Sequence, residues 1–179
     1  MAVLKMGEMN IRQETEADHP FVWQVVKTAF ASAEHSDGKE QELVEALRKS
    51  RSFIPELSLV ADIHGKIAGH ILFTQVTIGG CRQLALAPLS VLPQYQKEGV
   101  GMALMDRGHC IARELGYDYC VVLGHERYYP KAGYCPASFY GIKAPFAAPD
   151  KNFMAIKLNP LAKPLEGVVL YDRAFGIGT

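Results

Sequence analysis

After a short strand-like stretch over residues 9–14, the apolar residues of this chain follow a helical period. Thr15 is followed three residues later by Asp18, the spacing of a capping box at a helix start, with Asp where Glu or Gln is usual. Apolar positions then recur every three or four residues and predict an amphipathic helix, and a second helix is expected over 39–49. The apolar faces of these helices consist of Val22, Val25, Val26, Ala29 and Phe30, and of Leu43, Val44 and Leu47.

The middle of the chain contains runs of apolar and β-branched residues that predict three strands, over 57–63, 67–78 and 81–92. A turn at His64-Gly65-Lys66 separates the first two, and Gly79-Gly80 is a two-residue hairpin signal before the third. The pattern therefore predicts an antiparallel meander whose last strand runs into a polar loop.

A helix and a further strand are predicted after that loop. The helix spans 99–115 and ends at Gly116, a C-terminal cap, and the apolar run over 119–123 is typical of a buried parallel strand. The segment 84–123 is thus strand, loop, helix and strand, which requires a right-handed crossover. One side of the helix is expected to consist of Val100, Leu104, Gly108, Ile111 and Leu115.

The remaining elements are predicted to be short. A helix is expected over 126–132, ending at Gly133, with strands over 134–138 and 152–158 and a loop over 139–151. We divide the chain into a flexible tail, one domain and a C-terminal extension without assigned structure, which are residues 1–8, 9–159 and 160–179.

Composition narrows the class of protein. A chain of 179 residues with 49% apolar residues is expected to form one domain with a single core. The formal net charge is +0, which gives no general electrostatic attraction to nucleic acid or to anionic membranes. We find neither a signal peptide nor an apolar run that could span a membrane, and we expect a cytoplasmic protein. The cysteines have no zinc-ligand spacing and are expected to be reduced thiols; they are Cys81, Cys110, Cys120 and Cys135.

The polar loop after the meander has the spacing Gln96-x-x-Gly99-x-Gly101 at a helix start. Glycines allow a ligand to approach the backbone, and the first amides of a helix, together with its dipole, bind phosphate groups. Leu104 stands where a dinucleotide-binding loop needs a small residue, and no Gly-Lys-Ser or Gly-Lys-Thr occurs in the chain. The loop instead resembles the acyl-CoA pyrophosphate loop of the GNAT superfamily of N-acetyltransferases.

A second motif supports this resemblance. Tyr129 lies four residues before Gly133-Tyr134, after the predicted strand over 119–123. This arrangement is similar to the GNAT segment in which a short helix carries a tyrosine, and the resemblance covers residues 9–158. Three positions depart from the family pattern. Lys97 and Glu98 stand where glycine and a basic residue are common, and Pro130 restricts the residue before it.

The resemblance implies an α/β fold with a mixed, mostly antiparallel central sheet, a splayed parallel strand pair and flanking helices. It also implies acetyl-CoA as cosubstrate, no metal, and direct attack by a primary amine of a small molecule or peptide in a ternary complex. Tyr129 would protonate the leaving CoA thiolate, although Tyr128 competes for this role. The backbone of Val91 and Leu92 would pair with the pantetheine arm. The pyrophosphate would be held by Gln96, Lys97, Glu98, Gly99, Val100, Gly101 and Met102.

Several alternatives stay open at this point. The candidates for the general base are His70, which is more typical of a core histidine, and the side chains of Glu34, His35, His125 and Glu126, acting directly or through water. We interpret the Ser90 hydroxyl as a hydrogen-bond partner for the backbone of the splayed strand. A covalent acyl intermediate on Cys120 or Cys135 is the enzymatic alternative. A CoA-binding regulatory module without turnover, favoured by Glu98, is the alternative of another class. The acceptor is not identified, and a homodimer is one option for the oligomeric state.

Overall fold

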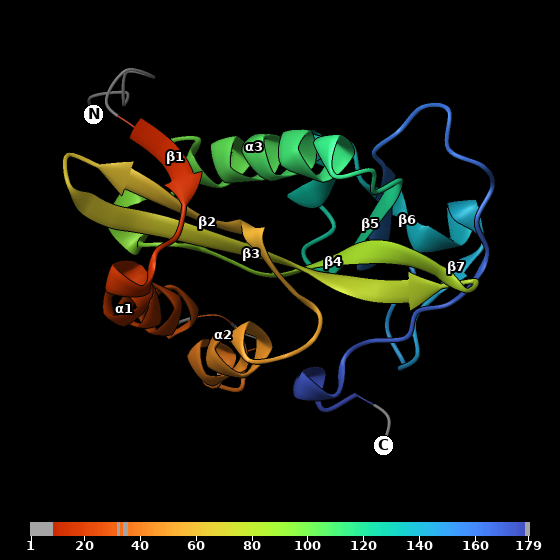
Figure 1. Cartoon of the computed structure of the whole chain (residues 1–179), viewed down its shortest axis with the longest axis horizontal. Coiled ribbons are helices and arrows are strands. Elements are labelled where there is room, and N and C mark those ends of the chain that lie inside the picture. Colours follow the sequence, from red (N-terminus) through yellow and green to blue (C-terminus); the bar gives the residue numbers. More distant parts are fainter. Residues whose placement is uncertain (1–8, 32, 34–35, 178–179) are drawn as a thin grey trace.

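The structure is a computed structural model in which residues 9–31, 33 and 36–177 are described. A seven-stranded sheet runs through the molecule in the order β1-β2-β3-β4-β5-β8-β6. Helix α3 covers one face of this sheet, and α1 and α2 cover the other (Figure 1). The strands of the large sheet are β1 (Met9–Gln13), β2 (Phe53–Ile63), β3 (Lys66–Ile78), β4 (Cys81–Val91), β5 (Tyr119–Leu123), β6 (Cys135–Pro136) and β8 (Phe153–Lys157). The helices are α1 (His19–Phe30), α2 (Glu40–Arg48) and α3 (Val100–Glu114).

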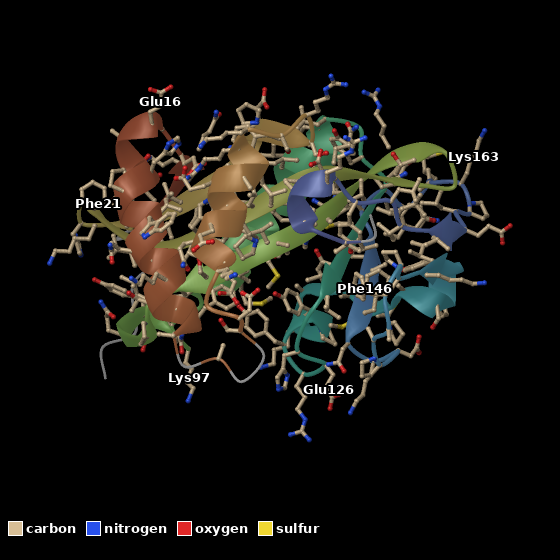
Figure 2. The ribbon with its side chains drawn as sticks, turned by 90° about the horizontal axis from the view of Figure 1, so that it is seen from below. Glu16, Phe21, Lys97, Glu126, Phe146 and Lys163 are labelled. Carbon is tan, nitrogen blue, oxygen red and sulfur yellow. The ribbon has the colours of Figure 1, made fainter. Side chains whose placement is uncertain are left out.

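Short elements fill the connections and the C-terminal part. A small parallel pair consists of β7 (Ile142–Lys143) and β9 (Gly167–Val168). The 3-10 helices are η1 (Glu16–Asp18), η2 (Pro93–Tyr95), η3 (Tyr129–Ala132), η4 (Ala137–Tyr140) and η5 (Arg173–Phe175). Viewed from below, η5 lies beside α2, and α1 lies on the far side of α2 on the same face of the sheet (Figure 2). The predicted α/β class and the mostly antiparallel sheet are confirmed.

The meander forms because its two turns have residues that accept a left-handed backbone. His64 and Gly65 have φ angles of 52° and 78°, and Gly79 and Gly80 have φ angles of 55° and 79°. Two successive residues with positive φ match the twist of a two-residue hairpin. Both hairpins predicted from the sequence are therefore present, and together they carry the chain to the end of β4.

The parallel strands β4 and β5 are paired over only a short stretch. The paired positions are Leu84 with Cys120 and Ala85 with Val121. Beyond them β4 contains an extra residue relative to β3, because Ile71 pairs with Leu89 and Phe73 with Leu86. A bulge of this kind bends its strand. The sheet therefore opens between β4 and β5 at their carboxyl ends, as the resemblance implied.

Helix α3 lies close to the sheet because glycines occur at the contact. A Cβ atom on Gly108 would overlap the ring of Phe73, and a Cβ on Gly69 would lie 3.0 Å from the Ser90 carbonyl oxygen and 3.2 Å from Val100. The prediction for the inward side of α3 was wrong at its end, since Leu115 is 44% exposed. Leu115 is the C-cap residue after the helix, and the buried residues of the last turns are Gly108, His109 and Ala112.

The predictions for the C-terminal half were partly wrong. The strand expected over 134–138 is limited to β6, because η4 begins directly after it, and the helix expected over 126–132 is limited to η3. The extension over 160–179, to which no structure was assigned from the sequence, packs against the sheet through its described part. Val169 is fully buried, and Leu170 forms an antiparallel bridge with Thr77 of β3. The extension thereby reaches the face of the sheet on which α2 lies.

Candidate active site

The first turn of α3 presents backbone amides at the open end of the sheet. The Ala103 N–H donates to the Gly99 carbonyl oxygen at 3.0 Å, so the amides of Val100, Gly101 and Met102 precede the first helical bond. Gly99 is the N-cap residue with φ 84°, and a Cβ at this position would meet no atom within 4 Å. The space beside Gly99 is therefore open to a ligand, and the helix dipole favours a negative charge there.

The loop before Gly99 is held in a turn by its own polar groups. The Gln96 side-chain amide donates to the Val91 carbonyl oxygen at 3.1 Å, so Gln96 supports the strand end in this structure. Lys97 has φ 65°, a left-handed conformation that favours glycine. This explains in physical terms why the corresponding position in the family often has glycine. Both Gln96 and Lys97 have exposed side chains.

Val91 and Leu92, the two residues predicted to bind the cofactor arm, differ in the direction of their backbone groups at the end of β4. Both backbone groups of Leu92 are bonded within the chain: its N–H to the Ala68 carbonyl oxygen and its carbonyl oxygen to the Tyr95 N–H, each at 2.9 Å. The expectation that Leu92 pairs with an added strand therefore does not fit. Backbone groups alternate between the two edges of a strand, so Val91 and Leu89 face the opening toward β5. Leu89 was missed, although counting every second residue from Val91 indicates it.

Two tyrosines lie between the start of α3 and the end of β5. A Cβ on Gly101 would overlap the hydroxyl oxygen of Tyr128, which places that hydroxyl against the first turn of α3. A Cβ on Gly124, the residue after β5, would overlap the ring of Tyr129. The two rings meet edge to face with centroids 5.3 Å apart. Tyr128 and Tyr129 are thus both near the opening, and the absence of side chains at the two glycines permits their positions.

The protonation of both tyrosines follows from their surroundings. Burial raises the pKa of the Tyr129 phenol above its usual value, and Tyr128 and Cys120 act in the same direction. Burial also raises the pKa of Tyr128. Both phenols are therefore protonated at neutral pH and can donate a proton or a hydrogen bond. The hydroxyl of Tyr129 has no hydrogen-bond partner among the described residues, which leaves it available to a ligand.

The second motif residue, Tyr134, belongs to the core beneath these rings. Its hydroxyl lies 2.9 Å from Nε2 of His109 on α3, and its ring meets that of Tyr129 with centroids 5.7 Å apart. Burial lowers the pKa of His109 to about 4, so this histidine is neutral at neutral pH. Burial raises the pKa of the Cys120 thiol to about 12. Tyr134 and His109 therefore support Tyr129 from below, and Cys120 is a thiol rather than a nucleophilic thiolate.

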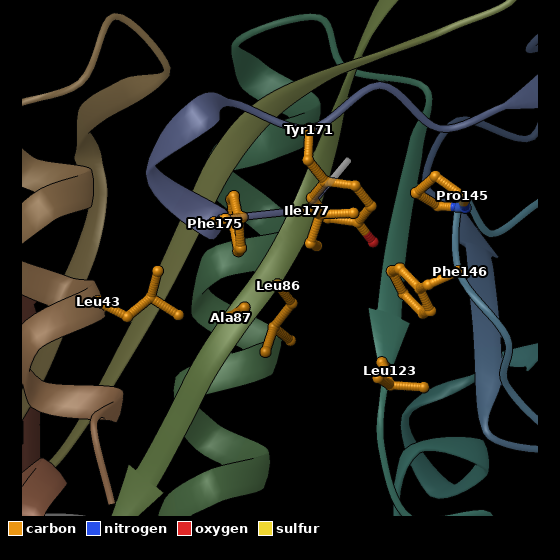
Figure 3. A pocket seen from close by; sticks show the side chains of 10 residues that line it. Leu43, Leu86, Ala87, Leu123, Pro145, Phe146, Tyr171, Phe175 and Ile177 are labelled. Carbon is orange, nitrogen blue, oxygen red and sulfur yellow. The ribbon is translucent and has the colours of Figure 1, made fainter. Parts of the chain in front are cut away.

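An apolar cavity of about 570 Å³ lies on the other face of the opening. Figure 3 shows it between α2, β4, β5 and the C-terminal segment, with α3 behind the sheet. Leu86 and Ala87 come from β4 and Leu123 from β5, directly beyond the last paired residues of these strands. The other lining residues are Leu43, Pro145, Phe146, Tyr171, Phe175, Gly176 and Ile177. Sequence reasoning missed this set, although the aromatic residues within a Pro- and Gly-rich C-terminal part were a signal.

His70, a candidate base, lies in a buried network. It is fully buried, and its Nε2 atom is 3.1 Å from the Ser58 hydroxyl and 3.4 Å from the Glu14 carboxylate. Arg48 also binds Glu14 through two hydrogen bonds of 2.8 and 2.9 Å. Burial lowers the pKa of His70, although Glu14 acts in the opposite direction. The geometry fits the interpretation of His70 as a core histidine, although only its Nε2 atom is bonded, and its Nδ1 atom is buried without a hydrogen-bond partner among the described residues.

The other polar candidates have different positions. Glu126 forms an ion pair with Lys151 at 2.7 Å, and the side chain of His125 is exposed and accepts a hydrogen bond from the Arg127 N–H at 3.1 Å. The Ser90 hydroxyl donates a hydrogen bond of 3.4 Å to the backbone carbonyl oxygen of His70 on the neighbouring strand β3. This contact agrees with the interpretation of Ser90 as a hydrogen-bond partner for the backbone of the strands. Glu34 and His35 lie outside the described residues.

Within the described part of the chain, no group of three or more His, Cys, Asp or Glu side chains is arranged to hold a metal ion. None of the helices in residues 9–31, 33 and 36–177 is both long and apolar enough to cross a bilayer.

Comparison with known proteins assigns this geometry to a family. The profile of the family described as "Acetyltransferase (GNAT) family" matches residues 14–134. The uncharacterized N-acetyltransferase YjhQ of Escherichia coli K12 is 42% identical over 119 residues, which are 64% of this chain and 66% of YjhQ. The uncharacterized N-acetyltransferase YhbS of the same strain is 28% identical over 93% of this chain and 98% of YhbS.

Two solved structures are similar over nearly the whole chain. A GNAT family acetyltransferase from Brucella melitensis, in complex with acetyl-CoA, is 34% identical with a TM-score of 0.77 and covers 93% of this chain and 97% of its own. YhbS from Escherichia coli, in complex with CoA, is 25% identical with a TM-score of 0.86 and covers 94% of this chain and 92% of its own.

Proposed function

This chain belongs to the acetyltransferase (GNAT) family, and on this premise we propose that it transfers the acetyl group of acetyl-CoA to a primary amine by direct attack in a ternary complex. The observation that carries the proposal is the start of α3, which presents unpartnered amides at the opening between β4 and β5. Similar structures contain acetyl-CoA or CoA, which supports acetyl-CoA as the cosubstrate of this chain.

The pyrophosphate is proposed to bind the amides from Lys97 to Met102. The open space beside Gly99 and the dipole of α3 support this assignment. Glu98 opposes an anion electrostatically, so its carboxylate has to face solvent in the complex. Gln96 contributes by holding the carbonyl of Val91, rather than by contact with phosphate.

The pantetheine arm is proposed to lie in the opening, against the edge of β4. The Val91 carbonyl oxygen already accepts a hydrogen bond from the Gln96 side chain, so the Val91 N–H and the backbone groups of Leu89 are the groups at this edge to which an extended amide chain can add as a strand does. The arm would then lead the thioester toward Tyr129 on one side and the apolar cavity on the other. This placement brings the two substrates together, and positioning supplies much of the rate of such a reaction.

The reaction itself requires a neutral amine, whose nitrogen attacks the thioester carbon to form a tetrahedral intermediate. The C–S bond then breaks, the amide forms, the nitrogen loses a proton to solvent, and CoA leaves as a thiol once its sulfur has taken a proton; the proton donor regains its proton from solvent. We assign to Tyr129 the donation of its phenolic proton to the departing sulfur. Its raised pKa keeps the phenol protonated at neutral pH and also makes it a weaker acid, which agrees with a moderate contribution to the rate. We assign the removal of the ammonium proton to water, because His70 is buried within the network around Glu14.

The alternatives are less well supported. A covalent route through Cys120 needs a thiolate, whereas burial raises the pKa of this thiol to about 12. A binding module without turnover does not account for two protonated tyrosines at the opening. The four cysteines are free, which supports a reducing, cytoplasmic location as part of this proposal.

The test compares two glycines that share one backbone conformation. Gly99 and Gly116 both have φ 84°, both flank α3, and a Cβ on either meets no atom within 4 Å. Gly99→Val and Gly116→Val should therefore lose similar stability, measured by urea unfolding. Acetyl-CoA affinity, measured by calorimetry, should fall at least about tenfold in Gly99→Val alone, because the valine crowds the pyrophosphate. Equal affinities in the two folded variants would contradict the binding site.

Transfer is then measured as thiol release from acetyl-CoA with a panel of amines. Amine-dependent release together with an acetylated product in the mass spectrum is the expected result. Binding of acetyl-CoA without release for any amine would favour the regulatory module instead.

A further inference from the structure

The walls of the apolar cavity are held in place by interactions outside it. The Leu170 N–H donates to the Thr77 carbonyl oxygen at 2.8 Å, and the reverse bond is 3.1 Å, which ties the C-terminal segment to β3. The Asp172 carboxylate accepts hydrogen bonds from the Ser52 hydroxyl and the Ala174 N–H, both at 2.9 Å. These bonds hold the backbone on both sides of Asp172 and thereby position the lining residues Tyr171 and Phe175. The cavity is therefore a pre-formed site rather than a gap beside a loose segment.

The aromatic residues of the cavity also support one another. The ring of Tyr171 lies 5.0 Å from that of Phe175 and 6.1 Å from that of Phe146, centroid to centroid. Phe146 in turn meets the buried Phe153 of β8 with centroids 5.8 Å apart. Figure 3 shows Phe146, Tyr171 and Phe175 around the space above β4. A flat or branched apolar group placed there would contact rings that are already ordered.

The lack of charge in the cavity lining restricts the charge that a bound ligand can carry. None of the ten described lining residues has a charged side chain, and Tyr171 alone has a polar side-chain atom. Its hydroxyl has no hydrogen-bond partner among the described residues. A cationic group buried among these ten side chains would find no carboxylate within the lining, and burial disfavours the charged form of an amine. The cavity therefore suits a molecule whose reacting amine is neutral and which has no second ammonium group.

The position of the cavity connects it to the reaction. Leu86, Ala87 and Leu123 line it at the point where β4 and β5 separate, which is where the proposed thioester lies. A volume of about 570 Å³ lies within the range of about 300–1,000 Å³ that is usual for small-molecule sites. A molecule in the cavity can thus present its amine to the opening while its apolar part contacts the rings.

We propose that the acceptor is a small primary amine on an aromatic or branched aliphatic skeleton without a second charged group, bound in this cavity. The inference rests on the proposed acetyl transfer and adds the substrate class to it. Phe146, Phe175 and Ile177 contact the skeleton, and the Tyr171 hydroxyl accepts a hydrogen bond from the amine or from a polar substituent.

The experiment measures kcat/KM for acetyl transfer with matched amines. 2-Phenylethylamine, tyramine and 3-methylbutylamine represent the proposed class, and putrescine, spermidine and kanamycin represent polycations. We expect kcat/KM for the apolar amines to exceed that for the polycations by at least about tenfold, as expected for the loss of an apolar contact or an unpaired charge. Binding of 2-phenylethylamine to the CoA-bound protein, measured by calorimetry, provides a second readout that does not need turnover.

Three variants locate the effect. Phe175→Ala and Phe146→Ala should each raise KM for 2-phenylethylamine about tenfold or more, with unchanged affinity for acetyl-CoA. Phe139→Ala is the matched control, since this phenylalanine is 78% exposed and does not line the cavity, and it should behave as the unmodified protein. Leu123→Glu places a carboxylate at a position that is 54% exposed and should improve kcat/KM for putrescine about fivefold or more.

The outcomes separate this inference from the function on which it rests. Transfer to polycations but not to apolar amines would overturn the substrate class and leave acetyl transfer intact. Transfer to peptide N-termini alone, with none to 2-phenylethylamine, would overturn the small-molecule assignment. Acetyl-CoA binding without thiol release for any amine, and without binding of 2-phenylethylamine, would overturn both. Equal effects of Phe175→Ala and Phe139→Ala would show that the acceptor binds elsewhere.

Discussion

The replacement of Tyr129 by phenylalanine tests the proposed proton donor directly. The variant keeps the ring, and with it the edge-to-face contacts to Tyr128 and Tyr134, whose centroids lie 5.3 and 5.7 Å away. The hydroxyl has no partner among the described residues, so its loss breaks no hydrogen bond there. We therefore expect the free energy of unfolding to change by less than about 1 kcal/mol. Any large loss of activity would then be chemical rather than structural.

The expected loss of turnover follows from the chemistry of the leaving group. General-acid catalysis contributes about 10²–10⁴-fold, and a thiol has a pKa of about 8.5, so its thiolate leaves fairly well without help. We expect kcat to fall about 100-fold, which corresponds to about 2.7 kcal/mol of activation free energy. The affinity for acetyl-CoA should be unchanged, because the phenol donates only as the thiolate forms.

The assay is thiol release over a pH series, with product confirmed by mass spectrometry. Burial raises the pKa of Tyr129, so the activity of the unmodified protein should show no loss from deprotonation of Tyr129 below about pH 10. Tyr128→Phe is the competing variant, and Tyr140→Phe, in η4, is the control outside the site. If Tyr128→Phe loses turnover and Tyr129→Phe does not, the donor is Tyr128. If both variants keep full turnover at every pH, water protonates the thiolate and the assignment to a tyrosine is wrong.

Three other predictions concern the framework of the site. Gly108→Ala should destabilise the fold by about 1–3 kcal/mol in urea unfolding, because its methyl group overlaps the buried ring of Phe73, whereas an unaltered midpoint would contradict this close packing. Lys97→Gly should keep the free energy of unfolding or raise it by up to about 1 kcal/mol, and should retain acetyl-CoA affinity, because glycine accepts φ 65° without strain. Lys97→Val should lower the free energy of unfolding, because a β-branched residue is strained at this φ. Equal stabilities of the two variants would refute the strain argument. His109 has a folded pKa of about 4, below its unfolded value of 6.5, so the unfolded state binds the proton first as pH falls. His109 should therefore reduce stability progressively between these values, by about 3 kcal/mol in total, and His109→Gln should flatten this part of the pH–stability curve; an unchanged slope would show that other groups cause it.

The sequence alone predicts the features that depend on neighbouring residues. The hairpins at His64-Gly65 and Gly79-Gly80 follow from the need for positive φ, and the run over 119–123 is observed as β5 within the same bounds. The start of α3 follows from Gly99, which adopts the left-handed conformation as N-cap. These features are local, because turn geometry, capping and strand period involve residues a few positions apart.

Other features depend on residues that are distant along the chain and meet only in the folded structure. The pattern of apolar residues indicates that α3 is amphipathic, yet Leu115, the C-cap residue of the helix, is exposed, whereas His109 and Ala112 are buried. The alternation along β4 is visible in the sequence, but the bonds of Leu92 to Ala68 and Tyr95 decide that Val91 and Leu89 face the opening.

The acceptor cavity is the clearest case of a feature that the tertiary structure decided. Leu43, Phe146 and Phe175 come from a helix, a loop and the C-terminal segment, and nothing in their spacing relates them. The cofactor loop could be recognised in the sequence because one turn and one helix start build it from adjacent amides. The cavity could not, because its walls are brought together by the bulge in β4, the bridge between Thr77 and Leu170, and the packing of η5 on α2. A site formed by consecutive residues is recorded in the order of the sequence, whereas a site formed by packing exists only once the elements are assembled.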